Sequence, residues 1–183
     1  LRAVGGWPDA IGEDIVLTWR LMEGGRRVYF EQTAVAFTDV PERLAHFMRQ
    51  RARWARGMLE GLRAVPPWRQ RRPLTKAVAG VDLLIPLLDV GYMCIWVPGL
   101  VLFLFGIPLV VSAWTLAVLP VTLLVYGGVR AFQARHVFGP LGLRVRRNRF
   151  GYVAFLLCYQ VLCSSASLAG YAQHLARARR RWK

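Results

Sequence analysis

The residues with the clearest chemical potential are Gln50, Arg51, Arg53 and Trp54, which lie within one five-residue stretch. On a helix, Gln50, Arg53 and Trp54 fall at positions i, i+3 and i+4 and therefore share one face. Arg holds phosphate oxygens through two parallel hydrogen bonds, and an indole packs on a sugar ring. The pattern suits a sugar diphosphate, although a solvated basic helix face with one packed Trp has the same spacing.

Two carboxylates, Glu13 and Asp14, follow a glycine-rich turn and open a predicted helix. A carboxylate at a helix N-terminus is stabilised by the exposed backbone N–H groups and the helix dipole, so simple capping explains the pair. The functional alternative is a general base that takes a proton from an attacking hydroxyl. The helical spacing runs over residues 13–23 and stops at Gly24 and Gly25, which predicts a helix end there.

The charge of the chain is concentrated in blocks. The formal net charge is +15, yet no Lys or Arg occurs between Val78 and Val129, and no Asp or Glu follows Asp89. Basic blocks separated by long apolar runs are typical of membrane proteins. Nucleic acid is disfavoured as a partner because the charges flank apolar spans instead of lining one soluble domain.

A second helix is predicted from Asp39 as N-cap, with Pro41 in its first turn and Glu42 completing a capping-box-like pattern. Short strands are expected before it, at residues 27–31 and 34–37. The helix should separate apolar residues from a polar side that includes Arg56 and Glu60, as in a helix that lies in a membrane interface. Packing on a soluble domain is the alternative. Pro66 and Pro67 should end the helix, and a basic linker follows.

Three apolar segments are long enough to supply the roughly 20 residues that cross a bilayer. They are residues 83–105, 107–126 and 150–175. Only Gly106-Ile107-Pro108 separates the first two, which predicts a tight hairpin with both basic flanks in the cytoplasm. If the third segment crosses once, the basic tail at 177–183 lies outside, against the positive-inside rule. Either that segment re-enters or lies partly in the interface, or residues 127–149 contain a further pass.

Two carboxylates, Asp82 and Asp89, share a helix face near the inner end of the first span. A carboxylate inside a membrane is a functional candidate, so Asp89 is a candidate to line a channel, with interfacial solvation as the alternative. Interfacial solvation accounts for Asp82. The three cysteines and three histidines show no ligand spacing, so the sequence predicts no metal site within this chain.

Taken in order, these motifs resemble the family 2 membrane glycosyltransferases. The resemblance rests on the turn containing Trp7, the segment around Glu13-Asp14, Phe30-Glu31, the Gln50–Trp54 stretch and the apolar spans after it. Among these enzymes, the pattern is most similar to poly-β-1,6-N-acetylglucosamine synthases. The likeness is specific over residues 5–60 and only architectural over residues 78–183.

The resemblance implies a role for each motif residue. Asp14 matches the catalytic base of inverting transfer, and Glu13 matches its usual neighbour. Gln50, Arg51, Arg53 and Trp54 match a motif that grips the donor pyrophosphate and contacts the acceptor sugar. Gly12 stands where the family usually has Thr, so a supporting hydrogen bond is not expected. The resemblance also implies Mg²⁺ or Mn²⁺, with its ligands upstream of this chain.

The expected fold class is therefore α/β, the C-terminal end of a GT-A domain, followed by an all-α membrane region. Residues 1–40 would end the GT-A domain, and 41–77 would form the interfacial helix and basic linker. Residues 78–176 would hold two to three transmembrane helices, and 177–183 the basic tail. The protein would be a multi-pass cell-membrane enzyme with its catalytic side in the cytoplasm.

The expected reaction extends a β-linked glycan from a nucleotide-sugar, with UDP-N-acetylglucosamine as donor, and the fragment alone should be inactive. The expected partners are the donor, a growing glycan or lipid acceptor, membrane lipids and an accessory membrane subunit. Two alternatives stay open. One is a non-processive glycosyltransferase that acts on a lipid or short acceptor, and the other is a non-catalytic membrane module whose basic helix binds anionic lipid.

Overall fold

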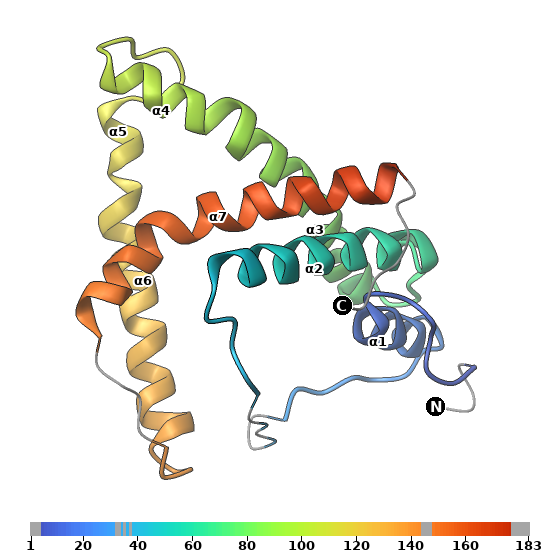
Figure 1. Ribbon diagram of the computed structural model, residues 1–183. Coiled ribbons are helices and arrows are strands. Elements are labelled where there is room, and N and C mark those ends of the chain that lie inside the picture. Colours follow the sequence, from blue (N-terminus) through green and yellow to red (C-terminus); the bar gives the residue numbers. More distant parts are fainter. Residues whose placement is uncertain (1–4, 32–33, 35, 37, 144–147, 177–183) are drawn as a thin grey trace. The chain divides into compact units, whose positions relative to one another are not determined.

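The computed structural model describes residues 5–31, 34, 36, 38–143 and 148–176 (Figure 1). It divides into two units. The first contains Leu1–Tyr29, Val40–Met93 and Val161–Lys183, and the second contains Phe30–Asp39 and Cys94–Gln160. The α-helices in chain order are α1 (Glu13–Glu23), α2 (Leu44–Ala64), α3 (Pro73–Gly91), α4 (Val97–Leu104), α5 (Ala113–Leu116), α6 (Val118–Gln133) and α7 (Arg149–Leu175). A 3₁₀ turn follows α2 (Pro67–Arg69), and π-helical turns follow α3 (Tyr92–Trp96) and α6 (Ala134–Phe138).

Helix α1 has the bounds that the sequence predicts. Its first turn carries both carboxylates, Glu13 and Asp14, where the helix dipole favours negative charge. At its end the N–H of Gly25 donates to the Met22 carbonyl (2.9 Å) and the N–H of Arg26 to the Leu21 carbonyl (3.0 Å). Gly25 has φ of 79°, as this glycine-dependent helix end requires. The predicted stop at Gly24 and Gly25 is therefore confirmed.

The predicted strands are not confirmed. Residues 27–31 have irregular backbone, and no strand occurs in the described part of the chain. The prediction for residues 34–37 falls partly on positions 35 and 37, which lie outside the described residues. A strand needs a neighbour to satisfy its backbone groups, whereas Tyr29 and Phe30 are 76% and 94% exposed. The described fold is helical, and the α/β assignment is not supported by it.

Helix α2 begins later than predicted. Its N-cap is Arg43, with extended backbone (φ −109°, ψ 137°) and no side-chain capping bond. Asp39, Pro41 and Glu42 therefore precede the helix, and the predicted capping box does not form. The end is as predicted: α2 stops at Ala64, and two prolines follow at once.

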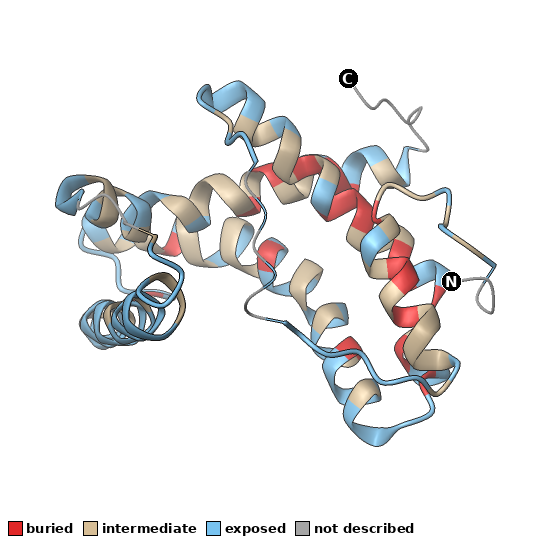
Figure 2. Ribbon diagram, turned by 90° about the horizontal axis from the view of Figure 1, so that it is seen from below, coloured by how far each residue is buried: buried red, intermediate tan, exposed pale blue. Residues whose placement is uncertain are grey.

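The core of the first unit lies between α1, α2 and the start of α3. Its buried members are Val16, Trp19, Leu62, Val65 and Ala79. The 3₁₀ turn after α2 returns the chain to this core, because the buried amide of Gln70 donates to the Trp19 carbonyl at 3.3 Å. Buried positions are few and lie mostly on the helices, whereas much of the remaining chain is exposed (Figure 2). This small core holds α1 packed against α2.

Two helical runs are long and apolar enough to cross a membrane. The first, Pro73–Leu104, joins α3 and α4 through the π-helical turn, and an 18-residue stretch within it has a mean hydropathy of 2.0. The second is Arg149–Leu175, in which an 18-residue stretch has a mean hydropathy of 1.6. The predicted segments 83–105 and 150–175 thus correspond to such helices, although the first helix begins at Pro73, within the predicted linker.

The predicted segment 107–126 is not a continuous helix. The helical run closes with Gly106 at φ 84°, and the N–H of Ile107 donates to the Leu102 carbonyl (3.0 Å). The chain then stays non-helical up to Ser112, which caps the short α5. Helix α6 has 16 residues, four to five short of a typical span. The predicted three-residue hairpin is therefore wrong, because closing the first helix and capping the next requires a longer connection.

Candidate functional site

The predicted face of α2 exists in the structure. Gln50, Arg53 and Trp54 all lie within Leu44–Ala64, so their spacing places them on one side of a real helix. Gln50 and Arg53 are half-buried. The Trp54 side chain is 51% exposed. An amide, a guanidinium and an accessible indole are thus presented together.

Arg51 lies over two aromatic side chains of α2. Its guanidinium carbon lies 4.3 Å from the centroid of the Trp54 ring and 5.1 Å from that of the Phe47 ring. Such a cation over an aromatic face is attracted by the ring quadrupole. Arg51 therefore lies against both aromatic rings. The sequence analysis missed Phe47, although its spacing from Arg51 and Trp54 (i, i+4, i+7) could have revealed it.

The motif face continues along α2 into its contact with α1. Gly57 and Gly61 follow Gln50 at i+7 and i+11 on the same side of the helix. A Cβ built on Gly12 would lie 2.8 Å from the Gly57 carbonyl oxygen, so the two backbones touch. A Cβ on Gly61 would lie 3.2 Å from Cγ2 of Ile15. Small residues four apart permit this close helix approach.

A buried ion pair supports the same contact. The Arg56 Nε donates to Glu60 Oε1 at 3.3 Å, and the side chains are only 9% and 11% exposed. The other carboxylate oxygen of Glu60 accepts from the backbone N–H of Ile11 at 3.3 Å. The sequence predicts Arg56 and Glu60 on the polar side of the helix, and the structure encloses this part of that side. Glu60 binds the loop that leads into α1, and Arg56 pairs with Glu60.

These contacts place the carboxylate pair next to the motif. Gly12 touches Gly57, which is one helical turn past Arg53, and Glu13 and Asp14 follow Gly12 directly. The Asp14 side chain is exposed, and its Oδ1 accepts from the N–H of Ile15 at 2.8 Å. Asp14 on α1 and Trp54 on α2 are therefore both accessible, and each lies within three residues of the Gly12–Gly57 contact.

The opposite side of α2 contacts α7. A Cβ built on Gly170 would overlap the carbonyl oxygen of Ala52 and lie 3.1 Å from the Cβ of Ala55. Ala52 is the central residue of the Gln50–Trp54 stretch. Helix α2 is therefore held between α1 on the motif side and α7 behind the motif.

Residues 1–129 match the family model described as glycosyl transferase family group 2. The chain belongs to this family. Two relatives of this glycosyltransferase chain share its sequence over shorter stretches. An N-acetylglucosaminyltransferase of Rhizobium sp. (strain N33) is 40% identical over 82 residues, which are 43% of this chain and 18% of the relative. A poly-β-1,6-N-acetyl-D-glucosamine synthase of Staphylococcus aureus (strain COL) is 44% identical over 55 residues, 30% of this chain and 13% of the relative.

The chain spans less than a fifth of the length of these curated relatives. No solved structure matches it. Family membership agrees with the resemblance carried by the Glu13-Asp14 pair and the Gln50–Trp54 stretch. The individual roles of these residues stay predictions.

Asp89, the predicted channel residue of this glycosyltransferase chain, is buried in the first unit and 7% exposed. Its Oδ1 accepts from the Ser164 hydroxyl at 2.6 Å, and its Oδ2 accepts from the Tyr171 hydroxyl at 2.7 Å. Both donors belong to α7. Asp82, seven residues earlier, is only half-buried. The channel role of Asp89 stays a prediction, and its two α7 partners were not foreseen.

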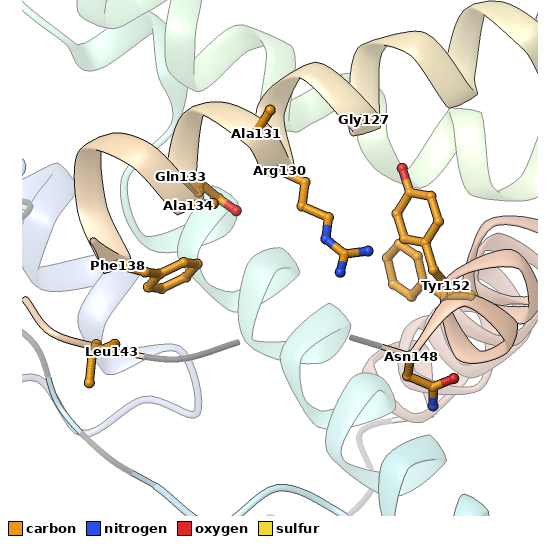
Figure 3. A pocket seen from close by; sticks show the side chains of 10 residues that line it. Gly127, Arg130, Ala131, Gln133, Ala134, Phe138, Leu143, Asn148 and Tyr152 are labelled. Carbon is orange, nitrogen blue, oxygen red and sulfur yellow. The ribbon is translucent and has the colours of Figure 1, made fainter. Parts of the chain in front are cut away.

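Neither a metal centre nor the pocket of the second unit involves the motif residues. In the part of the chain that the structure describes, no three His, Cys, Asp or Glu side chains gather as ligands for a metal ion. A pocket of about 770 Å³ opens between α6 and the first turns of α7 (Figure 3). There the Arg130 guanidinium lies 5.3 Å from the Tyr152 ring centroid. None of the residues that line this pocket belongs to α1 or α2.

Proposed function

We propose that this chain is part of an inverting membrane glycosyltransferase that extends a β-linked polysaccharide from UDP-N-acetylglucosamine. The observation that carries the proposal is the Gly12–Gly57 backbone contact, which supports it because Asp14 is two residues after Gly12 and Arg53 is one helical turn before Gly57. The names of the two relatives, both of which specify N-acetylglucosamine, support the choice of donor.

In this proposal Asp14 is the general base. Its carboxylate takes the proton from the acceptor hydroxyl while that oxygen attacks the anomeric carbon of the donor sugar. The bond to the diphosphate breaks at the same time, and UDP leaves with the electron pair. The exposure of Asp14 supports this role, because an incoming sugar hydroxyl can reach it.

Gln50 and Arg53 bind the donor diphosphate, and Arg53 stabilises the charge that develops as UDP departs. Trp54 packs on the acceptor sugar, for which its half-exposed indole is available. Arg51 orients that indole through the contact at 4.3 Å. This division of roles assigns one arginine to the donor and the other to the acceptor side.

The resemblance implies Mg²⁺ or Mn²⁺, but the described residues do not gather a ligand set for it. The ion would be held by residues upstream of this chain and would neutralise diphosphate charge when bound. The fragment alone is accordingly proposed to be inactive.

We further propose a multi-pass cell-membrane protein whose catalytic side is cytoplasmic. Two sufficiently long apolar helices and the basic residues flanking them support this arrangement. Membrane lipids surround these helices, and an accessory membrane subunit is compatible with their largely exposed surfaces. Nucleic acid has no part in the proposal.

The test is incubation of the full-length protein in membranes with labelled UDP-sugars. The expected product is a polymer labelled by UDP-N-acetylglucosamine and degraded by a β-linkage-specific hydrolase. A short or lipid-linked product would instead support the non-processive alternative. Absence of transfer from every UDP-sugar, with retained binding to anionic vesicles, would favour the lipid-binding module.

A further inference from the structure

Asp89 forms the polar link between the two apolar helices α3 and α7 within the first unit. Each of its carboxylate oxygens accepts one hydroxyl, from Ser164 at 2.6 Å and from Tyr171 at 2.7 Å. The two donors are seven residues apart on α7, which is about two helical turns, so both face the same side. Ser164 is fully buried and Tyr171 is 8% exposed.

This arrangement specifies the register of α7 more sharply than apolar packing does. A carboxylate inside an apolar helix pair is costly unless hydrogen bonds satisfy it. Sliding α7 by one turn, about 5.4 Å, would break both hydrogen bonds at once. Apolar packing, by contrast, is non-directional. The Asp89 contact therefore favours one position of α7 along α3.

That position determines what α7 presents to the motif helix. Gly170 precedes Tyr171 in the sequence and contacts Ala52 and Ala55 of α2. Only a glycine fits there, since any Cβ would overlap the Ala52 carbonyl oxygen. Fixing Tyr171 on Asp89 thus places Gly170 behind Ala52, the residue between the two arginines of the motif.

We infer that Asp89 is a positioning residue for sugar transfer, acting through α7 on the Gln50–Trp54 stretch. The inference rests on the proposed function for the reaction that it assists. The Asp89 carboxylate itself contacts neither the donor nor the acceptor. It fixes the position of α7 along α3. Helix α7 packs on the side of α2 opposite the motif face and thereby keeps that face aligned with Asp14.

The experiment uses full-length protein in nanodiscs and compares Asp89→Ala with Tyr171→Phe, which removes one hydroxyl and keeps the ring. Asp82→Ala is the matched control, because it removes a carboxylate from the same helix without touching Ser164 or Tyr171. Both test variants should lower turnover on the order of ten-fold per folded molecule. The control should stay within about two-fold of the parent. Asp89→Asn should recover part of the loss, because an amide still accepts a hydrogen bond.

A second readout does not depend on activity. Spin labels at Arg49→Cys on α2 and Gln173→Cys on α7, in a background without native cysteines, report the distance between these helices. Both positions are exposed. The distance distribution should shift or broaden in Asp89→Ala and Tyr171→Phe and remain unchanged in Asp82→Ala.

The two readouts separate the inference from the proposed function. A changed distance in a protein that transfers no sugar would overturn the proposed function and leave the α3–α7 register standing. Normal transfer with unchanged distance in both variants would overturn the inference. A lower melting temperature with full turnover per folded molecule would also overturn it, because Asp89 would then serve stability alone.

Discussion

Helix α2 contains two kinds of region with different roles. One is the motif face, with Gln50, Arg53 and the 51% exposed Trp54. The other is a set of small residues that touch neighbouring helices, Gly57 against Gly12 and Ala52 against Gly170. The motif face consists of long polar and aromatic side chains, whereas these contacts consist of glycine and alanine residues.

This difference suggests that catalysis and positioning are separable in this protein. Substitutions on the motif face should change rates or affinities and leave folding intact, because those side chains are accessible. Substitutions in the small-residue contacts should move helices and therefore change stability and activity together. Each prediction below tests one side of this comparison.

The largest effect is expected for Asp14→Asn. The amide keeps the shape of the side chain and cannot take the acceptor proton, so transfer should fall by roughly 10²–10⁴-fold. Initial rates with labelled UDP-N-acetylglucosamine in membranes measure this. Membrane insertion and melting temperature should not change.

Glu42→Gln is the matched control for Asp14→Asn, because it removes an exposed carboxylate that lies before α2 and outside the motif. Its rate should equal that of the parent. Near-normal turnover in Asp14→Asn would refute the assignment of the base.

Arg53→Ala should come next, with an effect on donor binding. Loss of a charge-assisted contact to the diphosphate is worth about 1.5–3 kcal/mol, so the affinity for UDP should fall by roughly ten-fold or more. Isothermal titration of the purified full-length protein with UDP measures the change. Arg49→Ala removes an exposed arginine one turn earlier and is the control. Equal UDP affinity in the two variants would leave Arg53 only a structural role.

Gly57→Ala tests the small-residue contact. A Cβ at this position would lie 2.9 Å from the Gly12 backbone nitrogen, so α1 must move away from α2. Overpacking of this kind costs about 1–3 kcal/mol, and both melting temperature and transfer rate should fall. Thermal unfolding in detergent and the transfer assay are measured on the same preparation.

Gly80→Ala is the control for Gly57→Ala, since a Cβ on this α3 glycine meets no atom within 4 Å. It should leave stability unchanged or raise it slightly, because alanine is the better helix former. If Gly57→Ala lost activity and kept its full melting temperature, the contact would belong to the chemistry and the proposed division would fail.

The parts of the fold that local signals determine were predictable from the sequence. Glycine at the end of α1 and prolines after α2 act within a few residues, and the helix ends predicted from them agree with the structure. Of the three predicted apolar segments, 83–105 and 150–175 correspond to helices long enough to cross a membrane, and 107–126 does not. The motif face was predictable for the same reason, because its spacing depends only on helix geometry.

Features that depend on distant partners were missed. The strand predicted at residues 27–31 needed a neighbour that the described chain does not supply. Arg56 and Glu60 fall on the polar side of the helix by periodicity, and they are enclosed because Ile11, 49 residues before Glu60, donates to the Glu60 carboxylate. The partners of Asp89 are 75 and 82 residues away. The spacing of Gly57 and Gly61 is a sequence signal for such a contact.

The smallest effect is expected for Arg51→Ala, which sharpens the comparison because Arg51 belongs to the motif and acts on its neighbour. Its guanidinium lies over the Trp54 ring at 4.3 Å, and a cation–aromatic contact at an accessible site is worth about 0.5–1 kcal/mol. Because the indole is proposed to pack on the acceptor, the KM for acceptor should rise two- to five-fold, as that energy implies. The affinity for UDP should stay the same. Arg51→Lys should restore part of the acceptor KM, since an ammonium also interacts with the ring. If Arg51→Ala instead weakened UDP binding as strongly as Arg53→Ala, both arginines would act on the donor, and the division of the motif into donor and acceptor sides would be wrong.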